Sequence, residues 1–519
     1  MKGKLETIYL SKNVGGARIR AMNTTIEVSL ALIPVLPLCG GAACGLLPGE
    51  SGARVSRAAA WAVAVLAAVA AGALAFGPAI GSAAGGLLML DGVSASMSLL
   101  VAVLGLAVVR FSVNTLRGDA QAGRFWRNLN LCLGLTQVLV LAGSLPVLAV
   151  GWIGSSLALH GLLLHFRDRG EARLAAWTKF LISRTGDACL LAGILVLHAA
   201  AGTWSIAGLA AWAANAPAQV PAAACGLFAA CALLKSVQVP FHSWLPDALE
   251  TPSSVSALMH AGVVNAGGFL LIRLSPVLVA APSVLAVVVA VGCFTVLFGS
   301  VVLAAQTSVK RRLAYSTVAQ MGFMMVECGL GAFGLALLHL LAHSAYKAHA
   351  FLRSGTAAGE PRPGLPVVKA WAVFAGLAVA AALVAAARWG ASLAGLPDGQ
   401  AVFDLVLGLG VAYGLAAAFS AGLRGGALLV ALLGVAVAQT AHEAGLALWA
   451  LPTASAAVGA SAAVASVTFA LLFALQLVLP HLAARPAGRA LHVHALNGFY
   501  LAAWTRRLMR RFGPVRNGV

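Results

Sequence analysis

The most constraining feature of this sequence is a succession of apolar runs that are each long enough to cross a lipid bilayer. A helix needs about 20 mostly apolar residues to span roughly 30 Å of hydrocarbon. A transmembrane β-barrel would instead show segments of about ten residues with alternating polarity, and the sequence contains no such series. The sequence therefore predicts an all-α polytopic membrane protein with about 13–15 transmembrane helices.

Short connections between the runs predict one transmembrane domain, residues 26–485, rather than several domains. A polar, basic segment, residues 1–25, precedes it and lacks the apolar stretch of a cleavable signal peptide. A basic tail, residues 486–519, follows it, and residues 355–368, rich in proline and glycine, form the clearest linker. The predicted spans are residues 28–47, 58–77, 93–113, 129–145, 146–166, 179–200, 219–239, 254–278, 283–305, 313–330, 332–352, 366–388, 401–422, 425–448 and 454–483.

The chain is strongly basic, with 34 Lys and Arg against 15 Asp and Glu, yet only 9% of its residues are charged. Soluble domains average about 25% charged residues. The basic residues lie mostly between the apolar runs, as Lys310, Arg311 and Arg312 do. This placement is typical of anchoring at anionic lipid headgroups, so we expect a lipid bilayer and no nucleic acid as partner. Basic segments at both ends predict two cytoplasmic termini.

The tail is predicted to form an amphipathic helix, because apolar and basic residues alternate in it at helical spacing. Such a helix lies in the membrane interface, and a docking helix for a soluble partner is the alternative. The residues concerned are Leu501, Trp504, Leu508 and Phe512 on one side and Arg506, Arg507, Arg510 and Arg511 on the other.

Ionisable residues inside predicted spans are candidates for function, because a charge at the bilayer centre costs about 2.5–3.5 kcal/mol on insertion scales. Arg184 and Asp187 share one helix face, either as a structural ion pair or as a pair whose Asp187 tunes a nearby lysine. Lys235 ends an apolar run and is followed by Pro240. A desolvated lysine at a broken helix is typical of ion sites in transporters, whereas a lysine reaching the interface is the structural alternative.

A second group of candidates follows the first along the chain. His260 is either a hydrogen-bonded core residue or a proton relay. His339, His343 and Lys347 recur every four residues and share one helix face. Two histidines at this spacing can bind zinc, but no third ligand is evident, so a hydrated proton wire is the favoured interpretation. Glu327 either joins this path or faces solvent.

Several long motifs show a resemblance to a known family. Residues 231–273, which include K-S-V-Q-V-P-F-H-S-W-L-P-D, resemble the proton-translocating antiporter-like subunits of respiratory complex I and of Mrp cation/proton antiporters. The resemblance covers about residues 85–355 and implies an antiporter-like bundle with two discontinuous helices that hold Lys235 and Lys347 near the membrane midplane. The other matching motifs are residues 127–134, 183–187, 306–324 and 339–352.

Within that superfamily, residues 259–273 and 345–352 are similar to the DabB family of inorganic carbon transporter subunits. The resemblance implies a chain that conducts H⁺ or Na⁺ and a large DabA-like partner with a zinc site similar to that of a β-carbonic anhydrase. Zinc is then expected in the partner, and no cofactor in this chain. Ile153 departs from the complex I pattern, which has glutamate after the tryptophan of G-W-E-G. Asp187 or another relay must therefore supply the acidic partner of Lys235.

The sequence thus predicts a multi-pass transporter subunit of the bacterial inner membrane, rather than an enzyme, with a cation path through Lys235, His260, Lys347 and the His339/His343 face. A subunit of a complex I-like enzyme or of an Mrp-type antiporter is the first alternative. A membrane anchor for a soluble enzyme is the second.

Overall fold

The computed structural model describes residues 2–76, 81–356, 367–393, 401–423, 425–449, 451–452, 458–482 and 485–512. Most of the expected linker at 355–368 lies outside the described residues, as do the side chains of Leu508, Arg510 and Phe512.

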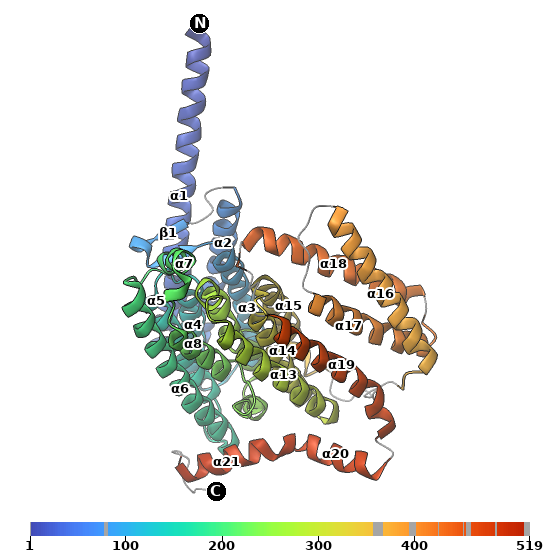
Figure 1. Ribbon diagram of the computed structural model, residues 1–519. Helices are drawn as coiled ribbons and strands as arrows, with labels where there is room; N and C mark the ends of the chain where they lie inside the picture. Colours follow the sequence, from blue (N-terminus) through green and yellow to red (C-terminus); the bar gives the residue numbers. More distant parts are fainter. Residues whose placement is uncertain are drawn as a thin grey trace.

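The described chain is a bundle of helices (Figure 1). Ten helices within the described ranges are long and apolar enough to cross a membrane, and each predicted span overlaps a helix. The all-α polytopic fold is therefore confirmed. The long helices are α1 (Lys2–Cys44), α2 (Gly49–Ala75), α3 (Gly92–Thr115), α4 (Ala122–Val140), α5 (Leu145–Leu163), α6 (Gly170–Ala201), α13 (Pro282–Ala305), α14 (Val309–Gly329), α15 (Phe333–Arg353), α16 (Ala370–Leu393), α17 (Ala401–Ser420), α18 (Gly425–Trp449) and α19 (Val458–Leu482).

Shorter elements lie between and after the long helices. The strands β1 (Gly81–Ala83) and β2 (Leu88–Leu90) pair antiparallel, with Gly81 opposite Leu90. Helices α20 (Pro486–Leu496) and α21 (Leu501–Phe512) cross one end of the bundle (Figure 1). The remaining short helices are α7 (Ile206–Asn215), α8 (Ala222–Lys235), α9 (Trp244–Asp247), α10 (Ser253–Ala261), α11 (Ala266–Arg273) and α12 (Ser275–Leu278).

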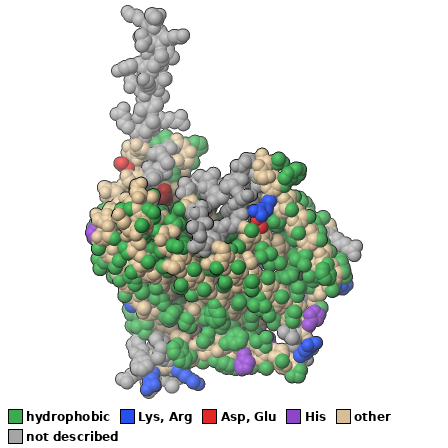
Figure 2. All heavy atoms as spheres, in the orientation of Figure 1, with side chains coloured by type: hydrophobic (Ala, Val, Ile, Leu, Met, Phe, Trp, Pro, Cys, Tyr) green, Lys and Arg blue, Asp and Glu red, His purple; other side chains and the backbone are tan. Residues whose placement is uncertain are grey.

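The two ends of the chain lie at opposite ends of the bundle (Figure 1). Ten of the described helices are candidate spans by length and composition, and the expectation that both termini share one side of the membrane stays a prediction. Figure 2 shows hydrophobic side chains over the flank of the visible face, with most of its Lys and Arg along the edge formed by α20 and α21. This distribution is that of a bundle whose flank faces lipid.

Small residues let the helices approach closely, which is how membrane helices gain packing energy without a strong hydrophobic drive. A Cβ atom on Gly292 of α13 would lie 2.7 Å from the carbonyl oxygen of Gly322 on α14, so a larger residue there would push the two helices apart. Buried apolar side chains form one continuous core from α1 to α15. A smaller core, which includes Val402 and Phe469, packs α17 and α19 against α13 and α14.

Candidate functional site

The first predicted helix break occurs at Lys235, the last residue of α8. Val237 follows with a φ of 50°, a left-handed conformation that costs a β-branched residue about 1–2 kcal/mol. Two hydrogen bonds hold the break in place: the Ser236 hydroxyl donates to the Val264 carbonyl at 2.8 Å, and the Val239 amide donates to Thr295 Oγ1 at 3.2 Å. The interruption is therefore fixed by its surroundings, and it leaves the lysine on a helix end whose carbonyl groups lack intrahelical partners.

Lys235 is buried against an aromatic ring. Its Nζ lies 4.6 Å from the ring centre of Trp152 on α5, within cation–π range, and has no hydrogen-bond partner among the described residues. Asp187 is buried on α6, which packs on this end of α8: a Cβ atom on Gly186 would lie 3.7 Å from Leu234 Cβ. The predicted Arg184–Asp187 ion pair forms, with Arg184 Nη2 2.7 Å from Asp187 Oδ2. The structural ion pair offered by the sequence is therefore present, and the role of Asp187 in tuning Lys235 stays a prediction.

Lys179 is a buried cation in the same region that the sequence analysis missed. It is 2% exposed, and its Nζ donates to the Ser156 carbonyl at 2.7 Å and to the Ser156 hydroxyl at 2.8 Å. The signal was present in the sequence, because Lys179 and Asp187 are eight residues apart and so share one face of α6.

The second interruption separates α10 from α11, with a short 3₁₀ turn at Val263–Asn265 between them. His260, fully buried on α10, has its Nδ1 3.1 Å from Thr317 Oγ1, and its ring stacks on Phe351 at a centroid distance of 4.1 Å. The expectation that Lys347 lies on a broken helix is wrong. Helix α15 is continuous around Lys347, because it contains no proline and no glycine after Gly334, whereas Gly262 ends α10.

The predicted face of α15 is present, with His343 and Lys347 buried and His339 partly exposed. Lys347 donates from Nζ to Ser316 Oγ at 2.7 Å and to the Leu313 carbonyl at 3.3 Å. The rings of His339 and His343 are 6.0 Å apart. Glu327 is 2% exposed, and its Oε2 lies 2.8 Å from His339 Nδ1. Glu327 thus joins the α15 face, and the alternative that it faces solvent is excluded.

The two interruptions touch each other. A Cβ atom on Gly267 of α11 would lie 2.3 Å from Ser236 Oγ and 2.4 Å from the Ala232 carbonyl oxygen. On the other side, Asn265 donates from Nδ2 to Ser344 Oγ of α15 at 2.8 Å. Polar contacts therefore run from the end of α8, through the α10–α11 break, to the helix that carries Lys347.

The contact at Gly267 gives a test of this arrangement. We expect Gly267→Val to prevent stable assembly, because both atoms that its side chain would meet belong to the fixed end of α8. The matched control is Gly226→Val on α8, where a Cβ atom would meet nothing within 4 Å. The measurement is the amount of monodisperse protein extracted from membranes. Equal yields for the two variants would contradict the packing of the two interruptions.

Comparisons with known proteins agree with this geometry. Residues 142–403 match the family described as NADH:quinone oxidoreductase/Mrp antiporter, TM. The chain is 36% identical over 432 residues to a probable inorganic carbon transporter subunit DabB of Hydrogenovibrio crunogenus, covering 80% of this chain and 82% of that protein. It is also 36% identical over 451 residues to DabB2 of Halothiobacillus neapolitanus, covering 83% and 81%. The chain belongs to the DabB family.

Similarity to redox-linked subunits is shorter. NADH-quinone oxidoreductase subunit L of Mycobacterium tuberculosis is 38% identical over 278 residues, which are 52% of this chain and 43% of that protein. Among solved structures, the Mrp complex from Dietzia matches with a TM-score of 0.57 and 24% identity, over 94% of this chain and 57% of that one. The DabB family thus shares the antiporter fold.

The zinc alternative gains no support from the geometry of the histidines in this DabB-family chain. His339 contacts Glu327 through Nδ1 and Gln320 Oε1 through Nε2, each at 2.8 Å. Within the part of the chain that the structure describes, no three His, Cys, Asp or Glu side chains converge as a ligand set.

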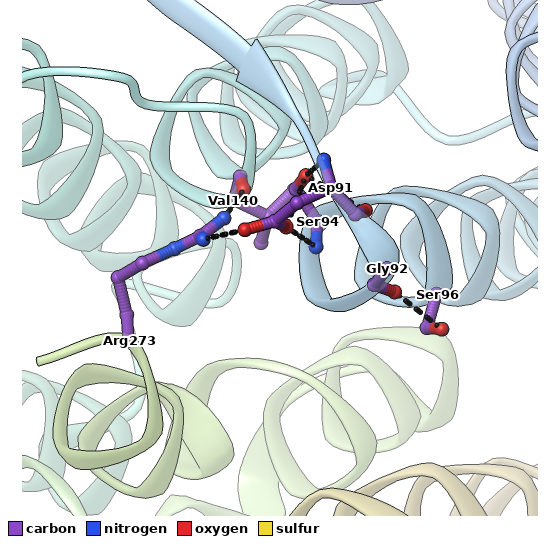
Figure 3. Close-up of polar contacts among 6 residues, drawn as sticks. All are labelled: Asp91, Gly92, Ser94, Ser96, Val140 and Arg273. Atoms are coloured by element: carbon purple, nitrogen blue, oxygen red, sulfur yellow. Dashed lines mark hydrogen bonds and ion pairs between the residues drawn. The ribbon is translucent and has the colours of Figure 1, made fainter. Parts of the chain in front are cut away.

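A buried ion pair anchors the far end of the second interruption (Figure 3). Arg273, the last residue of α11, donates from Nη1 to Asp91 Oδ2 at 2.6 Å and from Nη2 to the Val140 carbonyl at 3.3 Å. Asp91 also accepts a 2.8 Å hydrogen bond from the Ser94 amide and so caps α3. The pair fixes α11 to the start of α3 and thereby limits movement at the α10–α11 break.

We expect Arg273→Ala to destabilise the protein by about 3–5 kcal/mol, because it leaves the partly buried Asp91 carboxylate without its cation. Arg353→Ala is the matched control, since Arg353 is also the last residue of a helix but is exposed. The measurement is the thermal midpoint of the detergent-extracted protein. A midpoint for Arg273→Ala within a degree or so of the control would contradict the anchoring role.

Proposed function

We propose that this chain is the cation-conducting membrane subunit of an energy-coupled inorganic carbon transporter in the bacterial inner membrane. Its DabB relatives are described as probable inorganic carbon transporter subunits, and its fold is that of the Mrp-type antiporters. In this proposal, H⁺ or Na⁺ moves through the chain and drives the accumulation of CO₂ or bicarbonate by a second, DabA-like subunit.

The observation that carries the proposal is the set of buried titratable groups that lie on or beside the two helix breaks and on α15. Lys235 lies at the first break, His260 precedes the second, and Lys347 is buried on α15. Polar contacts between Ser236 and Val264 and between Asn265 and Ser344 hold these elements together. Burying so many ionisable groups in a membrane bundle is costly, and such groups usually mark ion or proton paths. A structural bundle would reach the same packing with apolar residues.

The chemistry of hydration is assigned to the partner. Zinc bound there would activate a water molecule for attack on CO₂. The titratable groups of this chain hold and move protons instead: Lys235 by exchange of its ammonium proton, and His339 by exchange with Glu327, while Gln320 Oε1 accepts a hydrogen bond from the other ring nitrogen.

The decisive experiment is uptake of labelled inorganic carbon in cells that express this chain with its partner. We expect accumulation to need both proteins and to fall at least about tenfold when a protonophore or a sodium ionophore collapses the driving gradient. Comparing the two ionophores identifies the ion. Failure to accumulate carbon, with both proteins present in the membrane, would contradict the proposal.

Exchange of one cation for another is the second candidate, and the match to the Mrp complex favours it. Its test is a cation-dependent pH change in vesicles that contain this chain without the DabA-like partner. A role as a membrane anchor alone predicts uptake that no ionophore affects.

A further inference from the structure

The C-terminal segment forms a strap across the end of the bundle. We define it as residues 486–512, which comprise α20, a sharp turn and α21 (Figure 1). The turn consists of Gly498, Phe499 and Tyr500, with φ values of 59°, 49° and 62°. Two adjacent non-glycine residues in the left-handed region cost about 1–2 kcal/mol each, and such a conformation persists only where its surroundings fix it.

The turn is pressed against two helices of the bundle. A Cβ atom on Gly498 would lie 2.8 Å from Tyr315 Oη, and the Phe499 ring packs against Phe298 at 5.8 Å. Gln306, just after α13, donates from Nε2 to the Leu496 carbonyl at 3.1 Å. The strap is therefore seated on the bundle at the turn and does not merely follow its surface.

The strap also binds the segment that follows Lys235. Arg506 of α21 pairs with Asp247, the last residue of α9, through Nε at 3.0 Å from Oδ2 and through a second, shorter contact from Nη2 to Oδ1. Its Nη1 lies 3.9 Å from Glu171 Oε2 at the start of α6. Two-point pairing of arginine with a carboxylate fixes orientation as well as distance. The Asp247 hydrogen bond raises the pKa of Arg506, so the guanidinium group of Arg506 stays charged at any physiological pH.

His242 of the same segment shares two aromatic neighbours with the turn of the strap. This ring is fully buried between Phe298, at 4.9 Å, and Tyr315, at 6.1 Å. These are the two side chains on which the turn of the strap packs. Residues 236–247 are thus packed near their middle, at His242, on the same two rings as the turn, and are held at their end by Arg506 through Asp247.

We propose that Arg506 is a positioning residue for cation transfer. By fixing Asp247 it holds residues 236–247, and through them the end of α8, in the geometry that presents Lys235 to Trp152 and Asp187. This inference rests on the proposed function. A positioning role for Arg506 differs from a role in membrane anchoring, which would depend on the outward residues Trp504 and Arg507, both exposed.

The test compares Arg506→Ala with Arg507→Ala, a matched control one residue away on the exposed side. In the uptake assay with the partner present, we expect Arg506→Ala to lower the maximal rate by about tenfold at an unchanged KM, since small displacements of a reacting group cost at least this much. Arg506→Lys should recover part of the rate. Asp247→Asn should reproduce the loss, and the double variant should fall no further than either single variant.

Hydrogen exchange measured by mass spectrometry on the purified full chain supplies a readout that does not depend on transport. We expect faster exchange in residues 236–247 for Arg506→Ala and wild-type exchange for Arg507→Ala. Unchanged exchange in that segment, or faster exchange with a wild-type uptake rate, overturns the proposal. If the wild-type chain shows no uptake at all, the proposed function has failed, and the exchange measurement still decides whether Arg506 fixes the segment.

Discussion

Replacing Lys235 with alanine should reduce cation-driven carbon uptake by more than about 100-fold, to the background of cells without the protein, because proton transfer through a positioned group contributes about this much. The lysine is 6% exposed and has a ring, not a hydrogen-bond acceptor, as its neighbour among the described residues. An alanine in its place leaves the first helix break without a group that exchanges protons. The measurement is the initial rate of labelled carbon uptake per unit of protein in the membrane.

The Lys235→Ala variant should still fold. The break is held by Ser236 and Val239, whose hydrogen bonds do not involve the lysine side chain. The removed ammonium group makes no hydrogen bond to a described residue, so its loss leaves no hydrogen-bond partner unsatisfied. The matched control is Lys369→Ala, which removes an exposed lysine before α16. Uptake that survives Lys235→Ala at the level of this control would remove Lys235 from the cation path.

The sequence identified most of the fold because membrane helices are encoded locally. Each apolar run must satisfy its own backbone hydrogen bonds, so its length and its flanking prolines and glycines predict a helix without knowledge of its neighbours. The same argument predicted the interruption after Lys235. It misassigned the second interruption to α15, although Gly262 marks the break in α10 and α15 has no such residue near Lys347.

The contacts of the candidate site were harder to predict, because they join residues far apart in the chain. Spacing alone paired Arg184 with Asp187, three residues apart. No spacing pairs Arg273 with Asp91 or Arg506 with Asp247, since those partners meet only in the folded bundle. Lys179 could be placed on the face of α6 that carries Asp187 from its spacing alone, but its contact with the Ser156 carbonyl group joins two helices and is not revealed by the sequence.

The second prediction of a large loss of carbon uptake follows from the isoleucine at position 153. In the complex I pattern, a glutamate at this position accompanies the lysine that matches Lys235, and this chain has none there. Asp187, buried on α6 and paired with Arg184, is the acidic group that we expect to take this role. Asp187→Asn keeps the shape of the side chain and removes its charge. We therefore expect it to lower uptake by about tenfold or more, because an opposite charge nearby changes a protonation equilibrium by about 10- to 1000-fold.

The control for Asp187→Asn is Asp404→Asn. Asp404 is also an ion-paired aspartate on a membrane helix, with Oδ2 3.2 Å from Arg388 Nε, but it joins α16 and α17 and touches none of the candidate groups. If the loss of uptake arose only from breaking an ion pair inside the bundle, both variants would lose uptake, each in proportion to its loss of stability. If Asp187 has taken the role that glutamate plays in the complex I pattern, only Asp187→Asn loses uptake at wild-type thermal stability. In that case the acidic group that tunes Lys235 lies on α6, next to Arg184, and not on α5. Lys235 then keeps an acidic partner, which a different helix supplies.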